Sequence, residues 1–121
     1  AAKSAAGSTK ILGVSLLTSL DEKDTLELYG NAFESQFNKL MTVAKSSSID
    51  GIVCSPQELV KLHDFNKLKV VPGIRNAQTE DDQKRTMSSE DAYAQGADYI
   101  VVGRPITQAS NVESALEEYL P

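Results

Sequence analysis

The chain has 121 residues, of which 40% are hydrophobic and 24% are charged, and its formal net charge is −5. This is the composition of one ordinary globular domain, and it excludes disorder, a collagen-like fibre and a coiled coil as the main structure. The acidic balance argues against a general nucleic-acid binder, and no apolar run reaches the roughly 18 residues that a membrane span requires.

Three features of the sequence narrow the chemistry further. Cys54 is the only cysteine, so we expect no internal disulfide and no cysteine zinc cluster, and a reducing, cytoplasmic setting is favoured. His63 is the only histidine, which leaves little material for a transition-metal site. Residues 1–6 lack the apolar core of a secretory signal, and the absence of an initiator Met indicates a processed, cut or truncated chain.

The first half of the sequence alternates strand and helix. Residues 11–17 (ILGVSLL) predict a mostly buried strand, and residues 21–24 predict a polar turn. Asn31 and Glu34 then resemble a capping pair. Apolar residues recur at helical spacings of four and three, which predicts one amphipathic helix along a single face: Tyr29, Phe33, Phe37, Leu40 and Ala44.

The alternation continues to the end of the chain. Ser55, followed by Pro56 and by Glu58 at the third helical position, is a strong helix start. Ser88 is expected to cap a later helix that stops at Gly96. The remaining predicted elements are strands at 52–54, 69–71 and 99–102, and helices at 55 to about 64, 88–94 and 112–119.

Buried strands that are each followed by a helix predict an α/β fold in which helices cover a parallel sheet. Four βα units of about 30 residues fill the chain. Ligands of such folds bind at the carboxyl ends of the strands. The residues at these ends are Thr18, Ser19, Ser55, the segment 72–75 (PGIR), Gly103 and Arg104.

Two of these strand ends suit an anion. A glycine after a buried strand, such as Gly103, lets a backbone N–H approach a phosphate, and Arg104 beside it offers a planar fork of donors. The polar stretch 74–87 is long for a compact domain and predicts a mobile lid with donors such as Arg75 and Gln83 on its inner side. Each segment also has an explanation without a binding role. Gly103 and Arg104 would then form a tight turn with a solvated arginine, and the stretch 74–87 would be a flexible surface loop.

Other chemically capable residues have simpler explanations. His63 is expected to be exposed on a helix, and Cys54 is expected to be a small core residue inside a strand. Asp81 and Asp82 are expected to be a solvated pair rather than a cation site. The alternating charges at 21–24 follow a strand end, where acid–base work is possible, but a turn and a helix start account for them.

Taken together, the strand ends resemble the bacterial orotidine 5′-monophosphate decarboxylases. The resemblance implies a (β/α)8 TIM-type barrel, with this chain supplying strands five to eight as the C-terminal half of one domain, residues 1–121. It also implies conversion of orotidine 5′-phosphate to uridine 5′-phosphate (UMP) and carbon dioxide in pyrimidine biosynthesis, without a cofactor. The segments that carry it are 17–19 (LTS), 50–55 (DGIVCS), 72–75 (PGIR), 82–85 (DQKR) and 96–107 (GADYIVVGRPIT).

The resemblance also implies a substrate-binding set: Thr18, Pro72, Arg75, Gln83, Gly103 and Arg104. Thr18 and Pro72 would contact the pyrimidine, Pro72 through its backbone. Arg75, at the base of the lid, and Gln83, on the lid, would hold the phosphate end, and Gln83 can also reach the base. Gly103 would bind the phosphate through its backbone N–H, and Arg104 through its guanidinium group.

The family's catalytic network is not found in this sequence. It consists of a D-x-K-x-x-D motif after strand three and a lysine after strand two, and its lysine donates the proton to the carbanion that carbon dioxide leaves. Asp21 and Lys23 match the start of the motif, but Leu26 stands where the second Asp would be. These residues also follow the strand expected to be the fifth of the barrel, whereas the motif follows the third. We therefore expect no catalytic residue, no metal ligand and no decarboxylase activity from this chain alone.

A half barrel would have two unpaired sheet edges and a bare apolar face, which predicts a partner. A complementary N-terminal half-barrel fragment is favoured over a second copy, and the surfaces of the family's homodimer are expected to be incomplete. No nucleic-acid or membrane partner is expected. The alternatives are a non-catalytic phosphate- or nucleotide-binding half barrel, a product that only assembles, and a sister phosphate-binding barrel such as the hexulose or gulonate phosphate enzymes.

Overall fold

The computed structural model describes residues 1–17, 19–76 and 86–121. It contains a four-stranded parallel sheet in the order β1-β2-β3-β4. The parallel βα arrangement predicted from the apolar runs is therefore confirmed, although β1 is much shorter than the run 11–17. The strands are β1 (Leu12–Val14), β2 (Gly51–Val53), β3 (Leu68–Pro72) and β4 (Tyr99–Val101).

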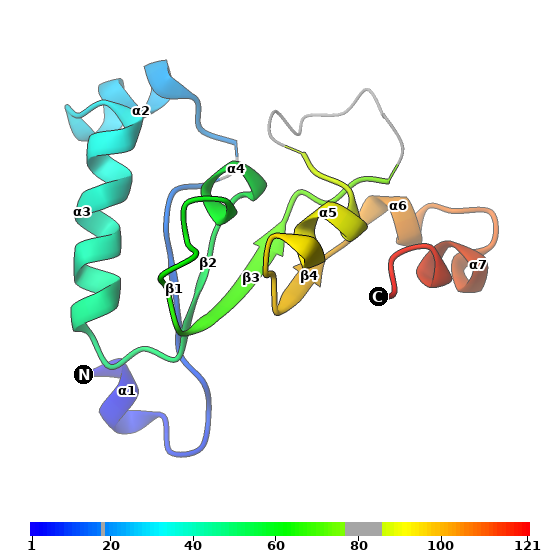
Figure 1. Ribbon diagram of the computed structural model, residues 1–121, viewed down its shortest axis with the longest axis horizontal. Coiled ribbons are helices and arrows are strands. Elements are labelled where there is room, and N and C mark those ends of the chain that lie inside the picture. Colours follow the sequence, from blue (N-terminus) through cyan, green and yellow to red (C-terminus); the bar gives the residue numbers. More distant parts are fainter. Residues whose placement is uncertain (18, 77–85) are drawn as a thin grey trace.

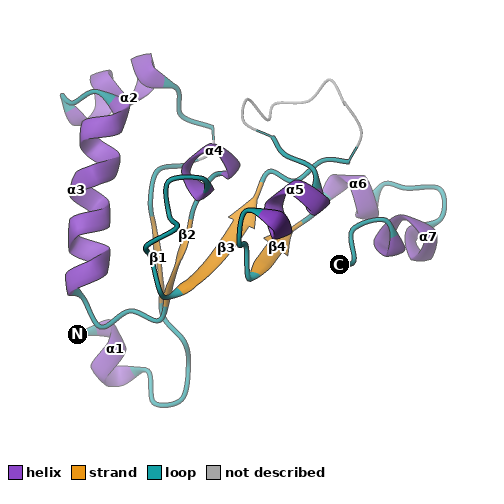
Figure 2. Cartoon of the chain, viewed as in Figure 1, coloured by secondary structure: helices purple, strands orange, loops and turns teal. Residues whose placement is uncertain are grey.

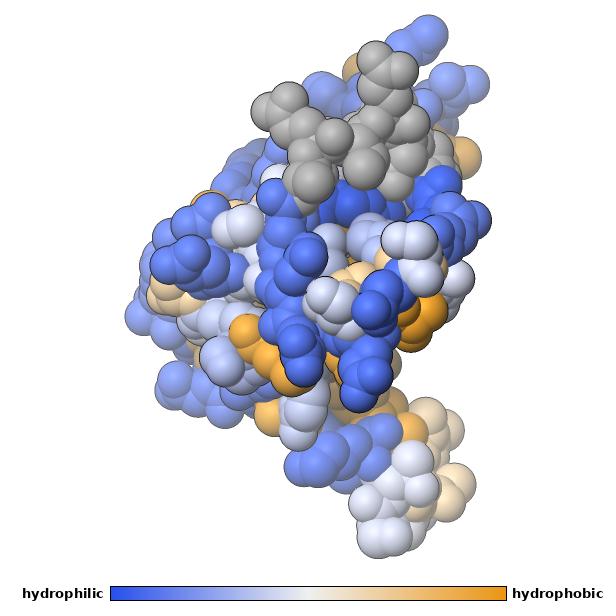
Figure 3. Space-filling model, turned by 90° about the vertical axis from the view of Figure 1, so that its right-hand side faces the viewer, coloured by the Kyte–Doolittle hydropathy of each residue, from blue (hydrophilic) through white to orange (hydrophobic). Residues whose placement is uncertain are grey.

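The helices flank the sheet (Figures 1 and 2). Helix α3 stands at one end of the molecule, the sheet lies in the middle, and α6 and α7 form the other end. That far end presents a mostly hydrophilic surface with scattered apolar patches (Figure 3). Among the described residues, no helix is long and apolar enough to cross a membrane. The helices are α1 (Ala2–Ala5), α2 (Glu22–Tyr29), α3 (Phe33–Ser46), α4 (Pro56–Leu59), α5 (Ser89–Ala94), α6 (Arg104–Thr107) and α7 (Val112–Glu117).

The core lies on one face of the sheet. Ile52 and Val71 belong to rows of side chains that point to the same face, because side chains alternate along a strand. Their exposed fractions are 1% and 0%. They form one cluster with Phe37 and Met41 of α3 and with Ala92 of α5. Burial between the sheet and these helices therefore supplies most of the apolar stabilisation.

The opposite face of the sheet is bare. Val14, Val53, Val70 and Tyr99 form one row across all four strands on that face. Val14 and Tyr99, which lie on the edge strands, are 56% and 58% exposed. The prediction of a mostly buried first strand is therefore wrong for β1, because an edge strand with one uncovered face leaves its apolar side chains in solvent.

The predicted amphipathic helix is in fact two helices. Gly30 adopts a φ of 65°, a left-handed conformation that glycine reaches without steric cost, and it ends α2 after Tyr29. The Asn31–Glu34 capping pair is also wrong, because Ala32 is the N-cap of α3 and caps with no side chain. The Asn31 Nδ2 atom donates instead to the Tyr29 carbonyl oxygen at 2.9 Å.

Several element boundaries also differ from the prediction. Residues 21–24 are not only a turn, because they begin α2 with a capping box. Helix α4 ends at Leu59, so His63 lies in a turn rather than on a helix, although it is exposed as expected. The caps at Ser55 and Ser88 are confirmed, since each side chain accepts a hydrogen bond from the backbone N–H three residues later.

Candidate functional site

The carboxyl ends of β3 and β4 lie next to each other. Pro72, the last residue of β3, is paired in register with Val101, the last residue of β4. The chain continues from these two positions to Arg75 and Arg104, so both arginines follow strands that end at the same edge of the sheet. Two guanidinium groups after neighbouring strand ends are suited to binding an anion such as phosphate.

The segment after β3 has a well-defined start. Gly73 has a φ of 80°, which turns the chain directly after the strand. Ile74 is fully buried and forms a parallel bridge with Met87, and the Arg75 N–H donates to the Met87 carbonyl oxygen at 2.9 Å. The half-buried Arg75 also donates from Nη1 to the Ile74 carbonyl oxygen at 2.7 Å. The two ends of the predicted lid are thus joined to each other, and the buried Ile74 ties them to the core.

The segment after β4 is open to solvent. Gly103 is the N-cap of α6, a helix that the sequence did not predict, and the exposed Arg104 is the first residue of that helix. A methyl group built on Gly103 would meet no atom within 4 Å. The backbone at this glycine is therefore accessible to an approaching group, which is the condition for binding an anion through its N–H.

Two predicted site residues, Thr18 and Gln83, lie outside the described residues, as does the part of the expected lid at 77–85. Their proposed contacts stay predictions. The other predicted binding residues come from two neighbouring strand ends: Pro72, Arg75, Gly103 and Arg104.

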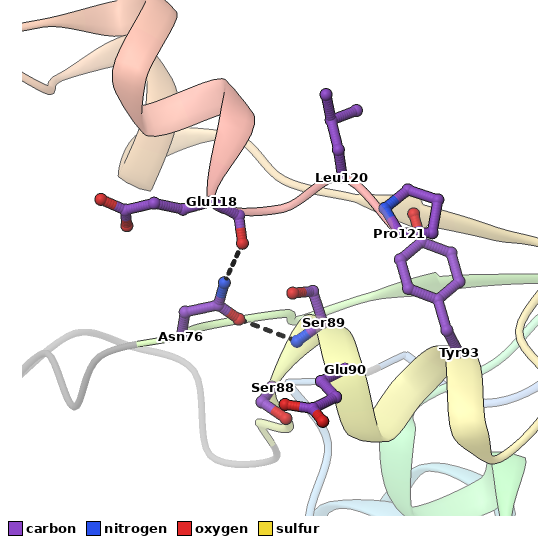
Figure 4. A pocket seen from close by; sticks show the side chains of 8 residues that line it. All are labelled: Asn76, Ser88, Ser89, Glu90, Tyr93, Glu118, Leu120 and Pro121. Atoms are coloured by element: carbon purple, nitrogen blue, oxygen red, sulfur yellow. Dashed lines mark hydrogen bonds between the residues drawn. The ribbon is translucent and has the colours of Figure 1, made fainter.

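A pocket of about 610 Å³ opens beside the start of α5 and the end of the chain (Figure 4). Asn76 bridges the two sides, because its Nδ2 donates to the Glu118 carbonyl oxygen at 2.6 Å and its Oδ1 accepts from the Ser89 N–H at 2.8 Å. Among the lining residues that the structure describes, the charged side chains are Glu90 and Glu118, and like charges there repel a phosphate. Pro72, Arg75, Gly103 and Arg104 are not among these lining residues.

Sequence reasoning missed a buried carboxylate near the ends of β1 and β2. Glu58 is fully buried, and its Oε2 accepts from the Ser55 N–H and from Ser15 Oγ, both at 2.7 Å. The serine–glutamate spacing predicts the first bond, which belongs to a capping box. The second bond joins residues 43 apart, and nothing in the local sequence indicates it.

Cys54 directly follows β2 and is 1% exposed, so the prediction of a core residue is confirmed. Burial, with a smaller contribution from the Glu58 carboxylate, raises the pKa of its thiol to about 12. The thiol is therefore protonated near neutral pH and is not a nucleophile. In the part of the chain that the structure describes, no three His, Cys, Asp or Glu side chains are grouped to hold a metal ion.

Comparisons with known proteins agree on one family. The model of the orotidine 5′-phosphate decarboxylase / HUMPS family matches residues 1–119. Orotidine 5′-phosphate decarboxylase of Vibrio cholerae serotype O1 is 46% identical over 114 residues, which cover 89% of this chain and 49% of that protein. The same enzyme of Neisseria meningitidis serogroup C is 43% identical over 116 residues, which cover 89% of this chain and 46% of the relative.

A solved structure gives the same result for the fold. The crystal structure of orotidine 5′-phosphate decarboxylase from Lactobacillus acidophilus matches with a TM-score of 0.69 and 37% sequence identity. The match covers 91% of this chain and 49% of that protein. This chain therefore spans about half the length of the relatives that it matches.

Proposed function

Because this chain belongs to the orotidine 5′-phosphate decarboxylase / HUMPS family, we propose that it supplies the phosphate- and pyrimidine-binding half of a barrel that converts orotidine 5′-phosphate to UMP and carbon dioxide. The observation that carries the proposal is the shared edge of β3 and β4. It supports a phosphate site made of Arg75, Arg104 and the Gly103 N–H.

The pyrimidine end of the substrate is assigned to the other predicted residues. Pro72 lies at the end of β3 and is half-buried, which suits a backbone contact with a flat base. Thr18 and Gln83 complete this proposed set, with Thr18 on the pyrimidine and Gln83 between base and phosphate. No residue of this chain is proposed to donate the proton, since the sequence lacks the D-x-K-x-x-D motif.

The proposed partner is a complementary N-terminal half barrel that carries this motif. The sheet ends on both sides at an edge strand, β1 and β4, and Leu12, Val14 and Tyr99 on its bare face are 37%, 56% and 58% exposed. Covering such a surface removes apolar area from water, which stabilises the complex. We further propose a homodimer of complete barrels and a cytoplasmic location.

Reconstitution tests this proposal. This chain is assayed for decarboxylation of orotidine 5′-phosphate alone and after coexpression with a fragment that carries D-x-K-x-x-D. We expect no turnover from the chain alone, turnover from the pair, and one native mass that contains both polypeptides. Turnover from the chain alone at the rate of the pair would contradict the proposed division between binding and chemistry.

A second candidate function is nucleotide binding without chemistry. The absence of the D-x-K-x-x-D motif from this sequence favours it, because the chain then holds binding groups without the lysine that would donate the proton. A third candidate is a sister phosphate-binding barrel. A higher affinity for UMP than for a hexulose phosphate supports the decarboxylase and the nucleotide-binding candidates. The reverse order of affinities supports the sister enzyme.

A further inference from the structure

One buried carboxylate oxygen joins the carboxyl ends of β1 and β2. Glu58 lies in the first turn of α4, and its Oε2 accepts from Ser15 Oγ and from the Ser55 N–H, both at 2.7 Å. Ser15 follows β1 directly, and Ser55 lies two residues beyond β2. A single side chain therefore holds two neighbouring strand ends and a helix start.

This arrangement goes beyond helix capping. A capping box requires only the bonds between Ser55 and Glu58, whereas the bond to Ser15 reaches another strand. The Ser15 N–H also donates to the Val53 carbonyl oxygen at 3.0 Å. Ser15, which is 7% exposed, is thus held through its backbone on one side and through its hydroxyl on the other.

The second carboxylate oxygen makes stability alone a poor explanation for Glu58. Its Oε1 is buried and has no hydrogen-bond partner among the residues that the structure describes. A buried polar atom without a hydrogen-bond partner destabilises the folded protein. An apolar side chain at this position would avoid that loss of stability. The cost is explained if the bond from Oε2 to Ser15 serves to fix the end of β1.

We propose that Glu58 is a positioning residue that fixes the end of β1 through Ser15 and thereby sets the recognition of the pyrimidine without acting on the phosphate. This inference rests on the proposed function, in which the segment after β1 faces the pyrimidine and Arg75, Gly103 and Arg104, after β3 and β4, bind the phosphate. None of the hydrogen bonds that the structure describes for Glu58 reaches β3 or β4. Loss of its carboxylate therefore removes none of the described hydrogen bonds of the proposed phosphate edge.

Two ligands separate the two ends of the site. Affinities for UMP and for ribose 5-phosphate are measured by calorimetry with the unaltered chain and three variants. Ser15→Ala removes only the bond to β1, Glu58→Leu removes both bonds, and Glu58→Gln keeps the shape of the side chain and an acceptor for both. Glu27→Gln, at an exposed position of α2, is the matched control.

We expect Ser15→Ala and Glu58→Leu to lower UMP affinity about tenfold, the effect of one hydrogen bond to a charged group, with ribose 5-phosphate affinity unchanged. Glu58→Gln and Glu27→Gln should keep both affinities. Equal losses for both ligands, or no loss in Ser15→Ala, would overturn the positioning role. If Glu58→Leu does not fold, Ser15→Ala decides alone. An unaltered chain that binds neither ligand would overturn the proposed function itself, a result distinct from loss of selectivity.

Discussion

Pro72 and Val101 are paired in register across β3 and β4, and Arg75 and Arg104 each follow this pair by three residues. A parallel sheet produces this relationship, because the carboxyl ends of its strands share one edge. In an antiparallel pair the two arginines would follow opposite edges. The parallel order therefore brings two arginines that are far apart in the sequence to one edge of the sheet, where we propose that they bind one anion.

The first prediction concerns the guanidinium group of Arg104. Arg104→Ala should lower UMP affinity about 10- to 100-fold, because a charge-assisted hydrogen bond to phosphate contributes roughly 1.5–3 kcal/mol. Thermal stability should change little, since this residue is exposed. Calorimetric titration with UMP measures the effect, and Lys39→Ala, an exposed cation on α3, is the control. Equal losses in both variants would point to general charge rather than to a site.

The second prediction concerns Gly103. Gly103→Ala should weaken UMP binding while leaving the unfolding temperature unchanged. The added methyl group meets no atom of the protein within 4 Å, so it can obstruct only a ligand that approaches this backbone. Titration with UMP and thermal unfolding are measured on the same preparation. A variant that binds UMP as tightly as the unaltered chain would remove this glycine from the proposed phosphate site.

The third prediction concerns Gly51 and serves as the counterpart of the second. A methyl group on Gly51 would lie 2.5 Å from the Leu68 carbonyl oxygen, on the neighbouring strand β3. The two strands must separate to admit it, so Gly51→Ala should destabilise the protein by about 1–3 kcal/mol. Urea unfolding measures this change. Unchanged stability would mean that the β2–β3 pairing is looser than its register indicates.

The fourth prediction concerns Cys54. Burial raises the pKa of its thiol to about 12, so the reactive thiolate is scarce at pH 8. A thiol-specific disulfide reagent should therefore fail to modify the folded protein and should label one thiol per chain in urea. Rapid labelling of the folded protein at the rate of a free thiol would contradict the buried position.

The fifth prediction concerns the ion pair between Lys3 and Asp50. The Lys3 ammonium group, and then the Ile11 N–H, lower the pKa of the Asp50 carboxyl. A lowered folded-state pKa gives stability that is complete above the ordinary Asp pKa of about 3.9 and is lost as the pH falls through the folded value. Asp50→Asn should lower the unfolding temperature at pH 7 and flatten its decline below pH 4.

Circular dichroism between pH 2 and pH 7 follows this dependence. Asp64→Asn, at an exposed position, is the matched control and should leave the acid decline unchanged. If Asp50→Asn declines as steeply as the unaltered protein, other carboxyl groups govern acid unfolding.

The sequence predicts what depends on local pattern. Apolar runs that are each followed by a helix predicted four parallel strands, and the serines at two helix starts predicted the Ser55 and Ser88 caps. The break between α2 and α3 was missed because the apolar spacing runs on through Gly30, whose left-handed φ only the structure reveals. A capping glycine followed by a polar residue was the available signal.

Long-range relationships could not be predicted in this way. The bond between Ser15 and Glu58 depends on where the start of α4 lies relative to the end of β1, and that placement has no local signature. The exposure of Val14 has the same origin, because an apolar strand has the same pattern whether one face or both faces are covered. The register of Pro72 with Val101 is also a property of the assembled sheet.

A comparison of UMP with uridine tests the proposed phosphate site most directly. If Arg75, Arg104 and Gly103 bind the phosphate, calorimetry should show one UMP per chain and uridine binding at least about 100-fold weaker, since the nucleoside lacks the group that these residues contact. Uridine affinity equal to that of UMP, or no UMP binding at millimolar concentration, would contradict a phosphate site at the edge of β3 and β4.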